Sequence, residues 1–415
     1  MSKTSRRDVL KIGGAAAAGL VVGGVGGWYS SQVFAPAGGA GPRLSGEIPI
    51  GILHASPVEV TPEAPAIDMA FEDINNFVQQ FNMDVKFVPI KENAEESSTK
   101  AVERTQTLIE RGCQVIIGPE WSGILQAIMP LVNERKVVVI SQSSSSPRLA
   151  IAGDYVYRLQ PDDTHQAVAI RRITTELGIK AVIVMYGREA YAEGLWRETE
   201  PKWKEAGIEI IEALGVDPEK RDFRGELSVL DGKFKEARSK YTKDEIGVFI
   251  WANTAASVAA FSNLSDFPDL MSARVFDADA GGLPGYATEV GAKARLTAYA
   301  FGPPASPKYI EWSERYKAIT GYEKPYFTAV NIYDSIWIGA LSVLTAGTYK
   351  GDAVAKVVPV VASSYFGVSG WCILNDAGDR KYATYDIMQV VMEGGTPTWK
   401  TIGFYDESTD KITWY

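Results

Sequence analysis

Short apolar runs alternate with longer amphipathic ones from residue 47 onward, and this alternation constrains the fold more than any other feature of the chain. In the segment 62–81, for example, apolar side chains recur at steps of three and four residues, which predicts a helix. Strands alternating with helices favour parallel sheets covered by helices on both faces, which is the α/β class. Strands are predicted at 48–53, 85–90, 113–117, 137–140, 181–186, 208–214 and 246–250, and helices at 62–81, 95–111, 122–134, 191–205, 223–241 and 255–265.

The length of the alternating part indicates more than one core. It spans about 375 residues, which exceeds what a single hydrophobic core usually supports. We therefore expect two Rossmann-like lobes, each built on its own parallel sheet.

The residue types that carry most metal binding and nucleophilic catalysis are scarce. The 415 residues include only two histidines, His54 and His165, and two cysteines, Cys113 and Cys372. This excludes a disulfide scaffold and a CxxC metal site, so we expect no metal, no cofactor and two unpaired, buried thiols. With 42 Lys and Arg against 51 Asp and Glu, the net charge of −9 also argues against nucleic acid as a partner.

The N-terminal segment 1–37 has the features of an export signal. Its four basic residues outnumber the single Asp8, and an uncharged apolar run follows at 12–25. The stretch S-R-R-D-V-L-K at 5–11 resembles the twin-arginine export signal, which implies a location on the periplasmic or extracellular face of the cytoplasmic membrane. Ala35-Pro36-Ala37 is a candidate cleavage site; without cleavage the segment would stay as a membrane anchor. Residues 38–46 read as a flexible tether in either case.

Serine clusters follow two of the predicted strands. The strand 115–117 is followed by G-P-E-W-S up to Ser122, and the strand 137–140 by S-Q-S-S-S-S-P up to Pro147. Ser145 or Ser146 before Pro147 predicts a helix N-cap. Ligands of parallel sheets bind beyond the carboxyl ends of the strands, where helix N-termini and hydroxyl groups suit a carboxylate. The alternative is that these serines only cap helices.

An ordered series of motifs resembles the branched-chain amino-acid type of periplasmic binding protein. The resemblance runs through nearly all of residues 47–400. It rests on I-G-P-x-x-S at 117–122, I-S at 140–141, S-x-P-x-L at 145–149, Y-R-L-x-P-x-D-x-x-Q-A at 157–167, D-F-x-x-x-L-x-x-L at 222–230, F-G-x-x-G-W at 366–371 and N-x-x-G-D-R at 375–380.

The resemblance implies a type I periplasmic-binding-protein fold, in which two lobes joined by three crossovers close on a ligand. The crossovers are expected near Asp163, Ala298 and Val361. Lobe one would then be 47–163 plus 299–361, and lobe two 164–298 plus 362–415, which places Cys372 in lobe two. The implied function is to capture a small carboxylate-bearing solute, above all an amino acid, and to deliver it to the permease subunits of an ABC importer. A monomer is expected, with membrane contact through an N-terminal anchor or through docking on the permease.

The resemblance also implies a set of ligand-binding residues. Ser122 and Ser145 are expected to hold the ligand carboxylate, and Asp279 its ammonium group, although Asp279 could instead be a cap or loop residue. The loop 54–62 departs from the glycine-rich turn usual in the family, so the surroundings of the ligand side chain are left open. The other expected site residues are Ser143, Ser144, Tyr191, Asn253 and Trp121, of which Trp121 is either a pocket wall or a core aromatic.

Two other functions compete with solute delivery. The same fold serves as a ligand-sensing receptor domain, which an uncleaved N-terminal anchor would tether to the membrane. A serine hydrolase could in principle use Ser122 and His165, but the chain has no G-x-S-x-G motif. An enzyme is therefore not expected.

Overall fold

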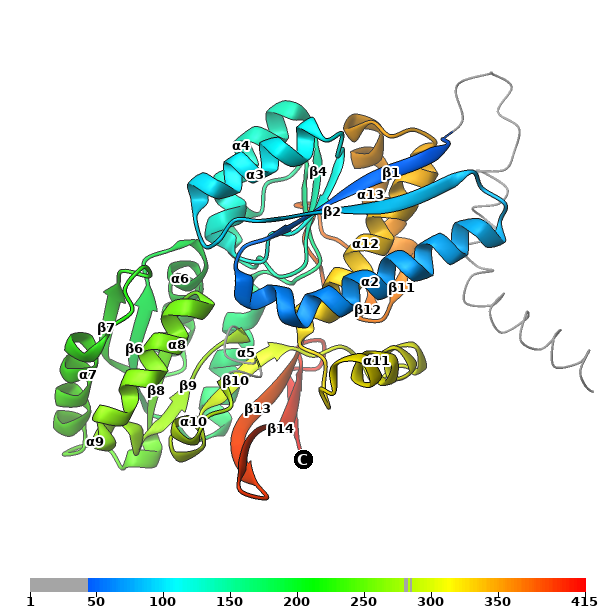
Figure 1. The fold of residues 1–415 in the computed structure, drawn as a ribbon. Helices are drawn as coiled ribbons and strands as arrows, with labels where there is room; N and C mark the ends of the chain where they lie inside the picture. Colours follow the sequence, from blue (N-terminus) through cyan, green and yellow to red (C-terminus); the bar gives the residue numbers. More distant parts are fainter. Residues whose placement is uncertain (1–43, 280–282, 284–285) are drawn as a thin grey trace, which may run out of the picture.

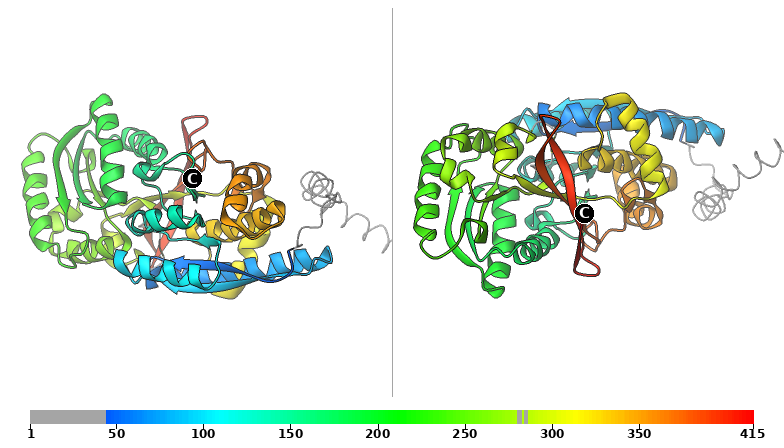
Figure 2. Two further views of the ribbon diagram at one scale, coloured as in Figure 1. Left: turned by 90° about the horizontal axis from the view of Figure 1, so that it is seen from above. Right: turned by 90° about the horizontal axis from the view of Figure 1, so that it is seen from below.

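Two α/β lobes make up the part of the chain that the structure describes. The computed structural model covers residues 44–279, 283 and 286–415, so the predicted signal and most of the tether lie outside it. The lobes lie side by side, and the chain passes between them three times (Figure 1, Figure 2). The predicted α/β class and two-lobe organisation are confirmed.

The sheet of lobe one is entirely parallel. Its strands are hydrogen-bonded in the order β2-β1-β3-β4-β5. They are β1 (Gly46–His54), β2 (Val85–Asn93), β3 (Val115–Ile117), β4 (Val138–Ser141) and β5 (Val156–Arg158). Apolar side chains on both faces are buried, and the helices that cover them are α2 (Pro57–Gln80), α11 (Pro307–Thr320), α12 (Phe327–Ala346) and α13 (Gly351–Ser364) on one face and α3 (Ser98–Glu110) and α4 (Ser122–Arg135) on the other.

The sheet of lobe two is mixed, which the sequence did not lead us to expect. Its order is β15-β14-β13-β10-β9-β8-β6-β7. The parallel strands are β6 (Ala181–Gly187), β7 (Glu209–Val216), β8 (Ile246–Trp251), β9 (Arg274–Phe276) and β10 (Thr297–Phe301). The antiparallel strands are β13 (Thr384–Glu393), β14 (Thr396–Asp406) and β15 (Lys411–Trp414). The helices are α5 (Asp163–Glu176) and α6 (Ala190–Glu205) on one face and α7 (Arg224–Ala237), α8 (Thr254–Asn263), α9 (Pro268–Met271) and α10 (Glu289–Lys293) on the other.

The second and third crossovers lie further along the chain than expected. Ala298 is inside β10, so the chain leaves lobe two only after Phe301. The short strands β11 (Phe366–Gly367) and β12 (Gly370–Trp371) still pack with lobe one, and Cys372 belongs to its core rather than to lobe two. The chain returns to the second sheet at Thr384. The shift arises because α13 is followed by a hairpin that continues to bury apolar surface on lobe one.

The start of α2 differs from the prediction in a way that matters for the site. The helix begins at Pro57 rather than at residue 62, because the Ser56 side chain accepts a hydrogen bond from the Val58 amide and Pro57 favours the first turn. Glu59 and Glu63 therefore lie one turn apart on the buried side of a helix. Conversely, the helix predicted after Ser146 is only a single 3-10 turn, Pro147–Leu149.

Helix α12 is the one described helix that is long and apolar enough to cross a membrane. Its 18-residue window is 89% buried inside the protein, which identifies it as the core helix of lobe one. Both cysteines are unpaired and buried, as predicted.

Candidate ligand-binding site

A pocket lies where the two lobes face each other, at the carboxyl ends of strands from both sheets. Every predicted site residue except Ser144 lines it. The lining residues are Glu59, Glu120, Trp121, Ser122, Ser143 and Ser145 of lobe one; Glu189, Tyr191, Asn253, Thr254 and Asp279 of lobe two; and Tyr326 and Phe327, at the start of α12, whose side chains pack in the core of lobe two.

The turn after β3 brings Ser122 to the pocket. Gly118 has φ +99°, and a Cβ atom there would lie 2.1 Å from the Leu53 carbonyl oxygen, so only glycine fits. The N-cap of α4 is Trp121, and Ser122 is the first residue of the helix rather than its cap. The segment 141–146, which we call the serine loop, starts at the last residue of β4. Ser122 Oγ accepts hydrogen bonds from the amides of Ser145 (3.3 Å) and Ser146 (3.2 Å), which fixes the serine loop against the start of α4.

Most backbone amides of the serine loop already donate to a serine hydroxyl, either within the loop or at Ser122. Ser144 Oγ lies 3.0 Å from Ser122 Oγ, and the Ser144 amide donates to Ser141 Oγ at 3.1 Å. The backbone of this loop therefore has few free donors for a ligand, because the amides of Ser144, Ser145 and Ser146 already have acceptors. Ser122, Ser143 and Ser145 line the pocket wall, where their hydroxyl groups can donate to a ligand.

Lobe two contributes a tyrosine–aspartate pair. Tyr191 lies in the first turn of α6, and its hydroxyl donates to Asp279 Oδ1 at 2.5 Å. Glu189 is the N-cap of α6 and accepts from the Tyr191 and Ala192 amides. Asn253 caps α8 by accepting from the Ala256 amide at 3.0 Å. Trp121 lines the pocket, whereas Trp251, the last residue of β8, is fully buried in the core.

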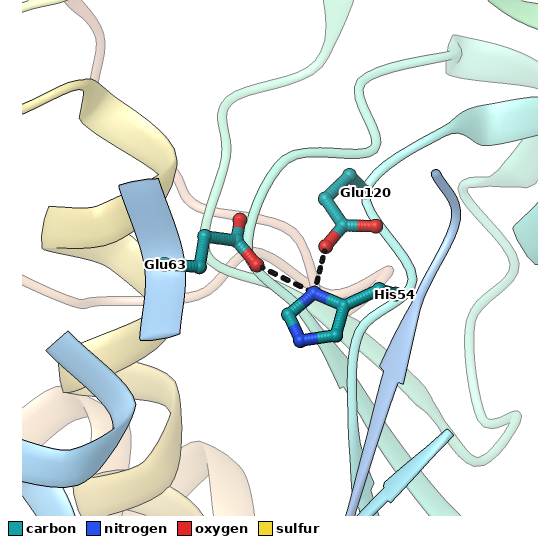
Figure 3. A group of neighbouring side chains, drawn as sticks. All are labelled: His54, Glu63 and Glu120. Atoms are coloured by element: carbon teal, nitrogen blue, oxygen red, sulfur yellow. Dashed lines mark hydrogen bonds and ion pairs between the residues drawn. The ribbon is translucent and has the colours of Figure 1, made fainter. Parts of the chain in front are cut away.

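A buried group of acids around His54 was not foreseen. His54 Nδ1 lies 3.1 Å from Glu63 Oε2 and 3.1 Å from Glu120 Oε1 (Figure 3). The Gln142 amide donates to both carboxyl groups, at 3.1 Å to Glu63 Oε1 and 3.1 Å to Glu120 Oε1. The Ala55 amide donates to Glu120 Oε2 at 2.5 Å. This network ties β1, α2 and the turn after β3 together directly behind the pocket.

The charges and hydrogen bonds of this network favour the protonated imidazole of His54. Burial alone would lower the pKa of His54, but its hydrogen bonds to Glu120 and Glu63 outweigh burial and raise the pKa to about 10. Burial, together with the charge of Glu120, raises the pKa of Glu63 well above its usual range. For Glu120, burial opposes ionisation, but the hydrogen bond and charge of His54 hold its pKa below the usual value. The result is an imidazolium–carboxylate pair of His54 and Glu120 beside Glu63, whose charged form burial disfavours.

His54, Glu63 and Glu120 could offer ligand atoms to a metal ion, since these atoms lie within 4.8 Å of one another. The hydrogen bonds favour another arrangement. A protonated imidazole has no lone pair for a metal, and the Gln142 amide already donates to both carboxyl groups. The side chains of His54, Glu63 and Glu120 are therefore engaged in hydrogen bonds and ion pairs with one another and with Gln142.

Glu59 joins the lobes across the pocket. Its Oε1 accepts from Trp121 Nε1 of lobe one at 3.3 Å and from Thr254 Oγ1 of lobe two at 3.1 Å. The Tyr326 hydroxyl also reaches lobe two, donating to the Asp279 carbonyl at 3.1 Å. The lobes therefore contact each other through residues of the pocket wall.

Comparison with known proteins decides the family. A family model described as periplasmic binding protein matches residues 60–394. The chain belongs to this family. An uncharacterized protein of Methanocaldococcus jannaschii is 28% identical over 369 residues, which cover 84% of this periplasmic binding protein and 86% of that relative.

Solved structures confirm the type I fold of this periplasmic binding protein. A branched-chain amino acid transporter substrate binding protein of Streptococcus pneumoniae, in complex with isoleucine, matches with a TM-score of 0.70 and 16% identity, covering 86% of this chain and 99% of that chain. An ABC transporter solute binding protein of Rhodopseudomonas palustris, in complex with 3,4-dihydroxybenzoic acid, matches with a TM-score of 0.66 and 16% identity, covering 87% and 97%.

The residues considered for a serine hydrolase lie in different surroundings. The Ser122 hydroxyl has the serine loop as its partner, whereas His165 Nδ1, on α5, lies 2.6 Å from Glu407 Oε2. A nucleophilic serine requires a histidine within hydrogen-bond reach. The geometry of this periplasmic binding protein instead provides a lined pocket with hydroxyl donors and carboxylate acceptors.

Proposed function

We propose that this periplasmic binding protein captures an amino acid, or a related carboxylate-bearing solute, between its lobes and delivers it to the permease subunits of an ABC importer. The observation that carries the proposal is the pairing of two complementary ends in one pocket: serine hydroxyls at a helix start on lobe one and the Tyr191–Asp279 pair on lobe two. Hydroxyls at a helix N-terminus stabilise a carboxylate, and a buried carboxylate stabilises an ammonium group.

The neighbours support this ligand chemistry. The Streptococcus pneumoniae structure holds isoleucine and the Rhodopseudomonas palustris structure holds 3,4-dihydroxybenzoic acid, and both compounds carry a carboxylate. The ligand would shift the lobes toward the closed arrangement by the amount that it prefers that arrangement.

The proposal includes the cellular setting. The S-R-R-D-V-L-K stretch at 5–11 supports export by the twin-arginine route. The protein would then work as a monomer outside the cytoplasmic membrane. The export signal lies outside the described residues, so this part of the proposal rests on sequence alone.

Removing serine hydroxyls is expected to weaken ligand binding more than folding. The double variant Ser122→Ala/Ser145→Ala should lose roughly 100-fold in affinity, because each hydrogen bond to a charged group contributes about 1.5 kcal/mol or more. Isothermal titration with the amino acid that gives the largest thermal shift in a screen measures this loss.

Two further variants separate binding from folding. Ser122 Oγ also accepts from two loop amides, so its loss loosens the loop, whereas Ser143→Ala/Ser145→Ala leaves those bonds in place. Ser262→Ala/Ser313→Ala, at two helix serines that do not line the pocket, is the matched control and should bind like the original protein. Unchanged affinity in both pocket variants would contradict the carboxylate role of the serines.

A further inference from the structure

The Glu59 carboxylate is buried, and one of its oxygens has no donor among the residues that the structure describes. The residue is 2% exposed and lines the pocket. Its Oε1 accepts from Trp121 and Thr254, but its Oε2 has no hydrogen-bond partner within residues 44–279, 283 and 286–415. A buried carboxylate oxygen without a donor is costly, and native proteins usually provide one. The missing donor is therefore expected to come from the ligand.

The charged residues around Glu59 also favour a cationic group of the ligand at this position. Four carboxyl groups line the pocket, those of Glu59, Glu120, Glu189 and Asp279, and the described lining includes no Lys, Arg or His. Behind the pocket, the positive charge of His54 is paired with Glu120 and that of Arg158 with Asp379. No described lining residue is therefore positioned to balance the charge of an ionised Glu59, and a cationic group of the ligand would do so.

We propose that the solute is a basic amino acid, whose side-chain cation donates to Glu59. This inference rests on the proposed function, which places the α-carboxylate at the serine hydroxyls and the α-ammonium group at Asp279. A third charged group of the solute then remains for Glu59, whose Oε1 accepts from Trp121 Nε1 in the pocket wall. The aromatic faces of Trp121, Tyr326 and Phe327 provide an apolar surface for the intervening methylene groups.

A cation with N–H donors fits this position better than a metal ion. The Trp121 and Thr254 donors that contact Glu59 Oε1 would remain in place and leave Oε2 as a directional acceptor. A divalent ion would require several oxygen or nitrogen ligands, and the carboxyl groups of Glu63 and Glu120 are already engaged with His54 and Gln142.

We expect the pocket to prefer an amino acid with a positively charged side chain over a neutral one of the same shape. L-Lysine and L-norleucine have closely similar shapes, but only lysine carries the distal ammonium group. Isothermal titration should show lysine, or its shorter homologue ornithine, binding about 100-fold more tightly than norleucine, since unpaired buried charges discriminate strongly. Cadaverine, which has two ammonium groups and no carboxylate, completes the panel.

Variants identify the residue responsible. Glu59→Gln keeps the size of the side chain and an acceptor for Trp121 and Thr254, and should reduce the preference for lysine over norleucine to below about fivefold. Ser122→Ala should weaken lysine and norleucine by the same factor, because both carry the carboxylate. Glu47→Gln, a change at an exposed glutamate of β1, is the matched control and should preserve the preference.

The outcomes separate the inference from the proposed function. Tight binding of norleucine with no preference for lysine or ornithine would overturn the inference and leave the proposed function intact. Binding of cadaverine without lysine would overturn the carboxylate role of the serines while supporting a cation at Glu59. If no compound of the panel binds at millimolar concentration, a basic amino acid is the wrong ligand.

The affinity for lysine is also expected to rise with pH. Burial and the charge of Glu120 raise the pKa of Glu59 to about 7, while hydrogen bonds from Trp121 and Thr254 and the charge of His54 oppose this rise. At neutral pH the empty site is therefore partly protonated at Glu59, and a bound cation favours the ionised form. Binding releases up to one proton, so affinity increases from about pH 6 to 8 and levels off above.

Titrations in two buffers that differ in ionisation enthalpy count the released proton. Tyr286 and Tyr326 also face Glu59 but stay neutral in this range, because burial raises their pKa values well above 10. Glu189 does titrate nearby, since burial raises its pKa to about 7. The Glu59→Gln variant should therefore remove most of the proton release, whereas Glu189→Gln should not. Proton release that persists unchanged in Glu59→Gln would contradict the assignment.

Discussion

Replacement of Asp379 by alanine is expected to lower the free energy of unfolding by about 3–5 kcal/mol, because it leaves a buried guanidinium group without its counter-charge. Arg158, the last residue of β5, is fully buried. Its Nε and Nη2 donate to Asp379 Oδ1 and Oδ2 at 2.5 and 2.6 Å, a bidentate arrangement. The loss in stability should be large because both side chains are buried, so water cannot take the place of the missing carboxylate.

The same guanidinium group supports the binding site. Arg158 Nη1 donates to the Ser146 carbonyl at 2.7 Å and contacts the Ser144 carbonyl at 3.4 Å, so it holds the serine loop from behind. Asp379 lies in the segment that leads from lobe one back to lobe two. The ion pair therefore anchors the third crossover to the loop that forms the pocket wall.

Chemical denaturation, followed by circular dichroism, measures the change. Asp68→Ala, which breaks the exposed Lys91–Asp68 pair, is the matched control and should change the free energy by less than about 1 kcal/mol. In the double variant Arg158→Met/Asp379→Ala no unpaired charge is buried, so part of the loss should be recovered. A loss below about 1 kcal/mol in Asp379→Ala would show that the pair does not stabilise the fold.

The pocket could be predicted from the sequence because its residues follow strands. Apolar runs locate parallel strands, and the carboxyl ends of those strands meet at one edge of each sheet. This reasoning, together with the family motifs, led to Ser122, Ser145, Tyr191 and Asp279, which the structure brings to one pocket. Whether they bind the ligand remains a prediction.

The acidic network behind the pocket could not be predicted in the same way. His54 and Glu120 are 66 positions apart, and nothing in the sequence pairs them. Glutamates at a four-residue spacing in a helix, such as Glu59 and Glu63, usually face solvent. Their burial follows from the early start of α2 at Pro57, which depends on the Ser56 cap.

The antiparallel extension of lobe two was missed although the chain carries a signal for it. Gly394 and Gly395, which have φ +58° and +87°, form the turn between β13 and β14. Paired glycines with positive φ are typical of a tight hairpin. β13 alternates between buried and less buried residues except at its bulge, whereas β14, which lies near the edge of the sheet, has few buried residues.

A second large effect is expected at Asp279. Asp279→Asn should weaken binding of the amino acid about 100-fold, since it removes the buried charge that faces the ligand ammonium group, and loss of one partner of such a pair costs at least about 2–3 kcal/mol. The asparagine can still accept the hydrogen bond from Tyr191, so the pocket should keep its shape. Isothermal titration of the variant with the best amino acid ligand provides the measurement.

The neighbouring Asp277 provides a matched control for this change. It is also buried and lies two residues earlier in the same loop, where Oδ1 accepts from the Ala278 amide at 2.8 Å, but it does not line the pocket. Burial raises the pKa of Asp277 well above its usual range, so Asp277→Asn changes a group whose charged form burial already disfavours. If ligand charge is recognised at Asp279, only Asp279→Asn should lose affinity. Equal losses in both variants would mean that the loop conformation, rather than the charge of Asp279, determines binding.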